Sequence, residues 1–157
     1  MTGTLAERFQ ASGGAPVEWG NQLVHMYEVL ELRASTAMRI EFLELSPARP
    51  QALRLKTRGG RLELNGQLLD DIVLWSDSAP EVVVATAHPD KSGKPMSVRV
   101  WNAWRDAEGT MQAWIGNAGM LIEGDSNTGL VLRCSDGFDE PTFSDLVAKL
   151  ALASVAH

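Results

Sequence analysis

The sequence predicts an all-β protein, an antiparallel β-sandwich of jelly-roll-like form with minor helix at the ends. About nine or ten short stretches are apolar or alternate between apolar and polar residues, and turn residues separate them every 8–12 positions. No regular alternation of strands with long helical patterns, as a βαβ fold requires, is present. The 157 residues suffice for one domain with a substantial core.

Composition and charge limit the function. Hydrophobic residues make up 45% and charged residues 22%, as is typical of a soluble protein. The net charge of −6 argues against binding to nucleic acid or to an anionic membrane. No apolar run reaches the ~20 residues of a membrane span, and the N-terminus lacks a secretory signal. Because Cys134 is the only cysteine, no internal disulfide is expected, and we predict a cytoplasmic protein.

The first part of the chain divides into a terminal segment and the start of the sandwich. Residues 1–20 are predicted to be loosely ordered, with a short helix over 4–10, and residues 21–157 to form the sandwich domain. Residues 22–33 fit both a helical stripe and a strand-like alternation. We favour a strand, because residues 38–45 alternate clearly as a half-buried strand.

A second group of turn signals lies between residues 55 and 66. Gly59-Gly60 predicts a type I′ hairpin in which Lys56 faces Glu63. Because Glu63 would neutralise Lys56 in this pairing, we interpret the basic cluster of 49–61 as a solvated face rather than a binding surface. Asn65-Gly66 predicts a further reversal, before short strands at 72–75 and 82–84.

Residues 97–115 hold three of the five tryptophans and predict a long hairpin. Its turn ends at Gly109, which is expected to adopt a left-handed conformation. In this register Arg105 faces Met111 and Trp104 faces Gln112, and the pairing continues to Val100 opposite Gly116. The predicted faces have different compositions. One is mainly apolar (Trp101, Ala103, Met111, Ala113 and Ile115), and the other combines two indoles with two amides (Trp104, Trp114, Asn102 and Gln112).

The C-terminal part predicts one more hairpin and one ambiguous segment. Residues 120–123 and 130–134 are expected to pair through the turn GDSNTG. The segment 142–154 fits a helical face and also the alternation of a last strand. We favour the helix, because alanine is the best helix former.

Few residues suggest catalysis or metal binding. The three histidines, His25, His88 and His157, lack the spacing of a metal site, and no cofactor is predicted. His88 lies among serines and carboxylates that could complete a triad, but no nucleophile-elbow motif accompanies it. The acidic residues of 136–145 match no defined calcium loop, and we favour turn formation over cation binding there.

The aromatic and amide face carries the functional hypothesis. Indole rings accept the flat surface of a sugar or ring compound, and amides supply paired donors and acceptors. We therefore predict a non-enzymatic module that binds a small molecule or glycan through Trp104, Trp114, Asn102 and Gln112. The alternative is a protein-interaction or homo-oligomeric protein with the same face as its interface. Packing of these indoles in the core is a third interpretation.

Overall fold

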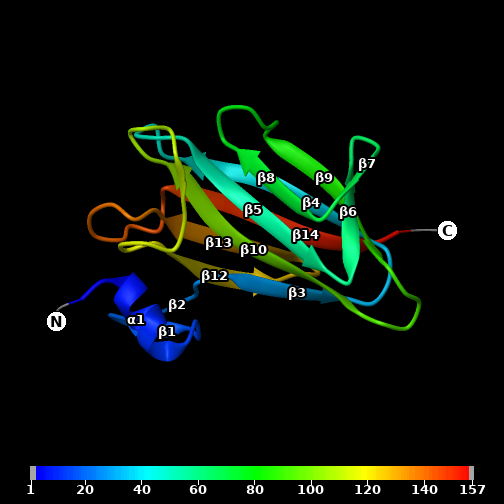
Figure 1. Cartoon of the computed structure of the whole chain (residues 1–157), viewed down its shortest axis with the longest axis horizontal. Coiled ribbons are helices and arrows are strands. Elements are labelled where there is room, and N and C mark those ends of the chain that lie inside the picture. The colour runs from blue at the N-terminus through cyan, green and yellow to red at the C-terminus, as the bar shows by residue number, and fades with distance from the viewer. Residues whose placement is uncertain (1–2, 156–157) are drawn as a thin grey trace.

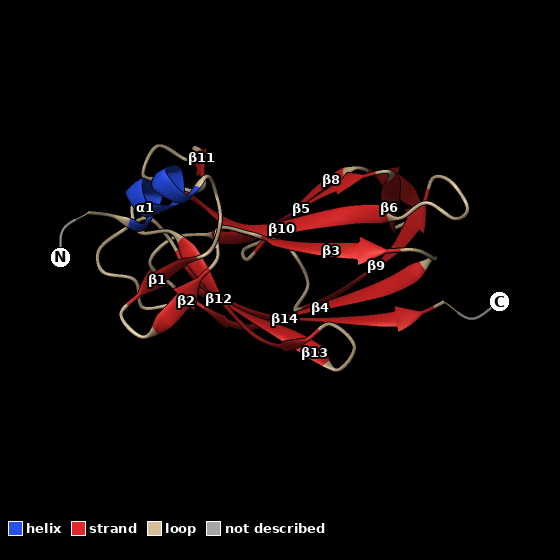
Figure 2. Ribbon diagram, turned by 90° about the horizontal axis from the view of Figure 1, so that it is seen from below, coloured by secondary structure: helices blue, strands red, loops and turns tan. Residues whose placement is uncertain are grey.

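In the computed structural model, which describes residues 3–155, two large antiparallel sheets pack face to face, which confirms the predicted all-β sandwich; a small two-stranded sheet and one helix accompany them. Figure 1 shows the five-stranded sheet in front of the seven-stranded one, and Figure 2 shows the two layers from the side. Within residues 3–155, no helix has the length and apolar character needed to cross a membrane.

The five-stranded sheet is organised around β10, which pairs along one edge with β5. The opposite edge of β10 is shared, because β3 pairs with Met96 to Val100 and β11 with Trp104 and Arg105. The strands of this sheet are β3 (Glu28–Leu32), β5 (Gln51–Arg58), β8 (Asp71–Trp75), β10 (Met96–Arg105) and β11 (Met111–Gln112).

The seven-stranded sheet has the order β12-β13-β14-β4-β9-β6-β7. Its strands are β4 (Thr36–Leu45), β6 (Gly60–Leu64), β7 (Gln67–Leu69), β9 (Val82–Pro89), β12 (Gly119–Asp125), β13 (Gly129–Ser135) and β14 (Leu146–Ser154). The predicted alternation of residues 38–45 is confirmed, with Met38, Ile40 and Phe42 buried. The strand assignment of 22–33 is also confirmed, as β2 (Gln22–Val24) and β3.

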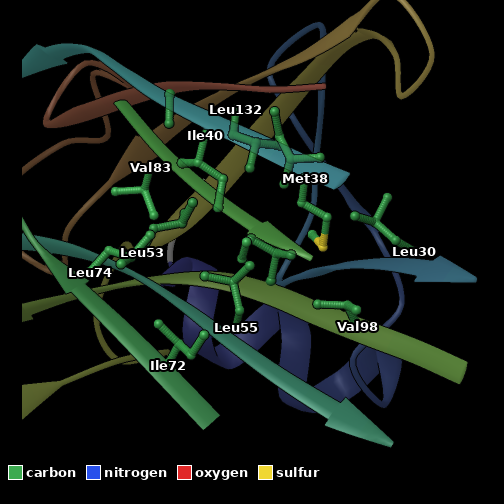
Figure 3. Packing of buried hydrophobic residues seen from close by; sticks show 14 of the residues in the cluster. Leu30, Met38, Ile40, Leu53, Leu55, Ile72, Leu74, Val83, Val98 and Leu132 are labelled. Atoms are coloured by element: carbon green, nitrogen blue, oxygen red, sulfur yellow. The ribbon is translucent and has the colours of Figure 1, made fainter. Parts of the chain in front are cut away.

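Alternate residues of both sheets fill the core between them. Figure 3 shows Leu53, Leu55 and Val98 from the five-stranded sheet opposite Met38 and Ile40 from the seven-stranded sheet. Because side chains alternate along a strand, the neighbouring residues on β5 and β10 point away from this core, toward solvent.

The N-terminal helix is present and packed. Helix α1 (Leu5–Ser12) starts with a capping box between Thr4 and Glu7 and ends at Gly13. The sequence predicts a loosely ordered segment here, whereas Leu5 and Phe9 are buried in a second apolar cluster. The strand β1 (Val17–Trp19) pairs with β2, so the domain boundary predicted at residue 21 falls inside a hairpin.

The hairpin predicted at Gly59-Gly60 is wrong. The strands on either side belong to different sheets, since β5 pairs with β8 and β10 while β6 pairs with β7 and β9. Gly59 has the expected positive φ of 77°, but Gly60 does not. A Cβ on Gly60 would lie 2.6 Å from Met96 Sδ on β10 of the other sheet, so this glycine permits the close approach of the two layers where the chain crosses between them.

The consequence for charge pairing is that Lys56 does not face Glu63. Lys56 lies between Asp71 of β8 and Arg99 of β10. The reversal at Asn65-Gly66 is confirmed, since both residues have positive φ and Leu64 pairs with Gln67.

The C-terminal helix favoured from sequence is wrong as well. Strand β14 lies in the middle of the seven-stranded sheet, paired with β13 and β4. Its Leu146, Ala148 and Leu150 are buried. Pairing on both edges and burial of one face outweigh the helix propensity of the alanines, because a short helix is only marginally stable without such contacts. The predicted hairpin of β12 and β13 is confirmed.

Candidate functional site

The tryptophan hairpin has the predicted register but is shorter than predicted. Trp104 pairs with Gln112 and Arg105 with Met111, and Gly109 has a φ of 80°. Pairing then stops, and Trp114 adopts a φ of 59°. Strand β3 pairs with β10 only as far as Val100, so it takes the place of the last predicted pair, Val100 with Gly116, and the edge at residues 101–103 stays unpaired.

The four predicted binding residues therefore do not share a face, and the predicted indole and amide platform is corrected. Asn102 and Trp104 point inward, and each is only 1% exposed. Gln112 donates a hydrogen bond to Asp106 within the turn. Trp114 lies on the outer side, where its ring packs against Trp101 with 4.8 Å between ring centroids.

The inward residues belong to the structural framework. Asn102 Nδ2 donates to the backbone carbonyl of Ser135 at 2.9 Å, which joins the two sheets. The ring of Trp104 packs so closely on Gly137 that a Cβ there would lie 2.8 Å from the indole. Trp104 Nε1 and Gln51 Oε1, from residues paired across β10 and β5, are buried without a hydrogen bond.

The outer face of the five-stranded sheet carries a groove of about 530 Å³. Its lining combines four cationic side chains, two indoles and three small or aliphatic residues. These residues are Arg54, Lys56, Arg58, Arg99, Trp101, Trp114, Val29, Thr57 and Ser97. The groove lies over β5, β10 and β3, which are side by side in Figure 1.

One end of the groove is fixed by the two indoles. Trp101, from the face predicted to be mainly apolar, is 4% exposed, but it packs outside the sandwich core rather than within it. Trp114 is half-buried, and its Nε1 donates to the backbone carbonyl of Met26 at 3.0 Å. This bond holds the Trp114 ring at the edge of β10 left open between β3 and β11.

Arg54 anchors the floor beside the indoles. Its Nε and Nη2 donate to the two carboxylate oxygens of Asp71 at 3.0 and 2.7 Å, and its guanidinium lies 5.3 Å from the Trp101 ring. The hydrogen bonds from Arg54 hold the pKa of Asp71 below its ordinary value, and those to Asp71 raise the pKa of Arg54. This pair uses two of the five guanidinium N–H donors.

The remaining cations of the groove are exposed. Lys56 and Arg99 lie directly opposite each other on adjacent strands, an arrangement of like charges that is unfavourable by itself. Arg99 also lies over the ring of Tyr27, 4.4 Å from its centroid. Arg58 lies two pairs further along, opposite Ser97, and is the next residue of β5 on this face.

The sequence held a signal for this site, in the basic cluster of 49–61. Arg54, Lys56 and Arg58 alternate along β5, which places them on one face. The incorrect pairing of Lys56 with Glu63 made that cluster look like ordinary solvated surface. The contribution of Arg99 from a distant strand has no local signal.

A hydrogen-bonded Ser-His-Glu chain lies elsewhere on the molecule. Ser35 Oγ is 3.1 Å from His88 Nδ1, and His88 Nε2 is 2.8 Å from Glu63 Oε1. The connectivity is that of a nucleophile, base and acid. None of these three residues lines the groove on the outer face, and their hydrogen bonds tie the β3–β4 turn to β9 and β6.

The acidic segment 136–145 contributes to a buried network. Asp136 Oδ2 accepts hydrogen bonds from Arg49 at 2.6 Å and from Gln51 at 3.0 Å. The backbone N–H of Asp136 donates to Asp145, whose pKa is raised by burial. Burial also raises the pKa of the Cys134 thiol, which disfavours the nucleophilic thiolate.

No group of three or more histidine, cysteine, aspartate or glutamate side chains suited to a metal ion occurs in the described part of the chain. His157 lies outside the described residues. Family models, curated proteins and solved structures gave no match to this chain. The functional hypothesis therefore depends on the geometry of the groove.

Proposed function

We propose that the protein is a binding module for a small ring-bearing ligand, held in the groove on the outer face of the five-stranded sheet. The observation that carries the proposal is the Trp101–Trp114 pair at the end of a 530 Å³ groove. Cavities of ~300–1,000 Å³ are typical of small-molecule sites. Trp114 replaces the predicted four-residue platform as the principal contact for the ligand.

The indole pair is pre-organised in the absence of ligand. Trp101 supports one face of Trp114, and the hydrogen bond to Met26 fixes the plane of the Trp114 ring. Because the side chain is already ordered, a ligand that stacks on it loses little additional conformational entropy. Arg54, which lies beside the indoles and uses only two of its N–H donors on Asp71, supplies donors next to the ring, as ring-bearing ligands with polar substituents require.

A Trp114→Ala variant tests the proposal. We expect it to stay folded and to weaken binding of ring probes at least tenfold, which corresponds to about 1.4 kcal/mol. Adenosine and methyl β-glucopyranoside serve as probes for a planar ring and a pyranose, and calorimetric titration measures their affinity.

The matched control is Trp75→Ala. Trp75 is also on the outer face of this sheet and is half-buried like Trp114, with the Arg105 guanidinium 4.1 Å from its ring, but it does not line the groove. Equal affinities of the wild type and the Trp114 variant would refute the proposal. Light scattering measures the oligomeric state of both proteins. If the wild type is a dimer and Trp114→Ala is a monomer, the indole surface serves self-association instead.

A further inference from the structure

The charge around the groove differs from that of the chain as a whole. The protein has a net charge of −6, yet four of the nine residues that line the groove are cations and none is a carboxylate. A cleft lined by one sign of charge concentrates ligands of the opposite sign.

Two carboxylates on the strands that flank the groove are paired with other side chains. Asp71 accepts both hydrogen bonds of Arg54, and Glu31 forms an ion pair with Arg33 at 3.3 Å. Among residues 3–155, neither Lys56 nor Arg99 forms an ion pair within 4.0 Å. The electrostatic influence of Lys56 on Asp71 is weaker than that of Arg54.

The opposed pair of Lys56 and Arg99 is the centre of this charge. Their Cα positions are directly paired across β5 and β10, so both side chains rise from the floor of the groove at the same level. Repulsion between two such cations is relieved when an anion lies between them. Lysine acts on an anion as a compact charge and arginine as a planar donor, and the combination suits both phosphate and carboxylate oxygens.

We infer that the ligand of the groove is anionic, with a phosphate or carboxylate group between Lys56 and Arg99 and its ring toward Trp114. This inference rests on the proposed function and adds the chemical class of the ligand. The charge of Arg54 is already paired with Asp71, so Arg54 is not part of the anion site. It packs against Trp101 and in this way positions the indole end of the groove, where the ring of the ligand binds. Arg58 lies next to the anion site and adds to its positive potential.

A small ligand fits these observations better than a polymer. The cations are confined to one groove, whereas nonspecific nucleic-acid binding requires a basic surface that follows many successive phosphates. The net charge of −6 repels a polyanion beyond the groove. A ligand with one anionic group is attracted to the groove and repelled far less elsewhere.

The experiment compares matched pairs of neutral and anionic probes by calorimetric titration at low ionic strength. Adenosine monophosphate against adenosine tests phosphate, and methyl glucuronide against methyl glucoside tests carboxylate. We expect one anionic probe to bind at least tenfold more tightly than its neutral partner, with an affinity that falls as salt is added.

Lys56→Gln and Arg99→Gln identify the residues responsible. Each is expected to reduce the preference for the anionic probe to less than threefold while the affinity for the neutral probe stays the same. Both side chains are exposed, so the variants should remain folded. Arg39→Gln removes an equal charge from the other sheet, where Arg39 pairs with Glu41, and should leave the preference unchanged.

The outcomes separate the inference from the proposed function. Equal binding of neutral and anionic probes, with loss on Trp114→Ala, would overturn the anion site and leave the ring site in place. No binding of any probe would overturn both. Tighter binding of a single-stranded oligonucleotide than of adenosine monophosphate would overturn the assignment to a small ligand.

Discussion

The two faces of β10 contain similar residues that serve different purposes. The inner face carries Asn102 and Trp104, and the outer face carries Arg99 and Trp101. On the inner face, the amide of Asn102 is bonded to Ser135 and the indole of Trp104 is enclosed. On the outer face, Arg99 faces another cation across an open groove.

This contrast shows how to distinguish a packed polar cluster from a recognition surface. Aromatic and polar residues are common to both, so composition alone does not decide. The difference lies in enclosure and charge. Asn102 and Trp104 are neutral and enclosed, even though Trp104 Nε1 has no hydrogen-bond partner, whereas Lys56 and Arg99 are charged and exposed. Where charged groups remain exposed and opposed, as at Lys56 and Arg99, an external partner gains energy by binding.

The largest expected effect concerns the inner indole. Trp104→Ala should lower the free energy of unfolding by roughly 3–5 kcal/mol, because it removes a large side chain that is 1% exposed. Trp114→Ala, which removes a half-buried ring, should cost about 1–2 kcal/mol. Urea unfolding of both variants measures the difference. Equal losses would show that the outer indole is as much a part of the packing as the inner one.

A second comparison concerns two of the arginine–aspartate pairs, the buried Arg49–Asp136 pair and the Arg54–Asp71 pair of the groove. Asp136 is 1% exposed and accepts bonds from Arg49 and Gln51 on a single oxygen. In Asp136→Asn, one orientation of the amide places its NH₂ group against the donors of Arg49 and Gln51. The other orientation offers them a neutral oxygen, which is a weaker acceptor than a carboxylate. We expect a loss of about 2–3 kcal/mol in urea unfolding at pH 7. A loss below about 0.5 kcal/mol would mean that the network relaxes into solvent.

The smallest expected effect is that of Asp71→Asn in the groove, because this pair is partly exposed. We expect a loss of about 0.5–1 kcal/mol at pH 7. Hydrogen bonds from Arg54 lower the folded-state pKa of Asp71, so its contribution is present above the unfolded pKa of about 3.9 and is lost as pH falls through the folded pKa. Unfolding curves of wild type and variant should therefore converge below about pH 4. A difference in the free energy of unfolding that does not change with pH would show that the charge of Asp71 is not its cause.

Much of the fold could be predicted because its signals are local. Met38, Ile40 and Phe42 alternate and lie in the core as predicted. Gly109 and the Asn65-Gly66 pair take the positive φ that their turns demand. The pairing of Trp104 with Gln112 follows from the turn length alone. The site was predicted only in part, since Trp114 lines the groove while Asn102 and Trp104 face inward.

The sequence by itself determined the class of fold, the position of most strands and the alternation of side chains within a strand. Steric limits on φ and the two-residue period of a strand act between neighbours and need no knowledge of distant residues. Tertiary structure decided which strands are adjacent. Gly59-Gly60 suits both a tight turn and a crossing between layers, and only the pairing of β5 with β10 selects the crossing. The same pairing brings Lys56 opposite Arg99, because contacts between residues far apart in the chain depend on the packing of the whole sandwich.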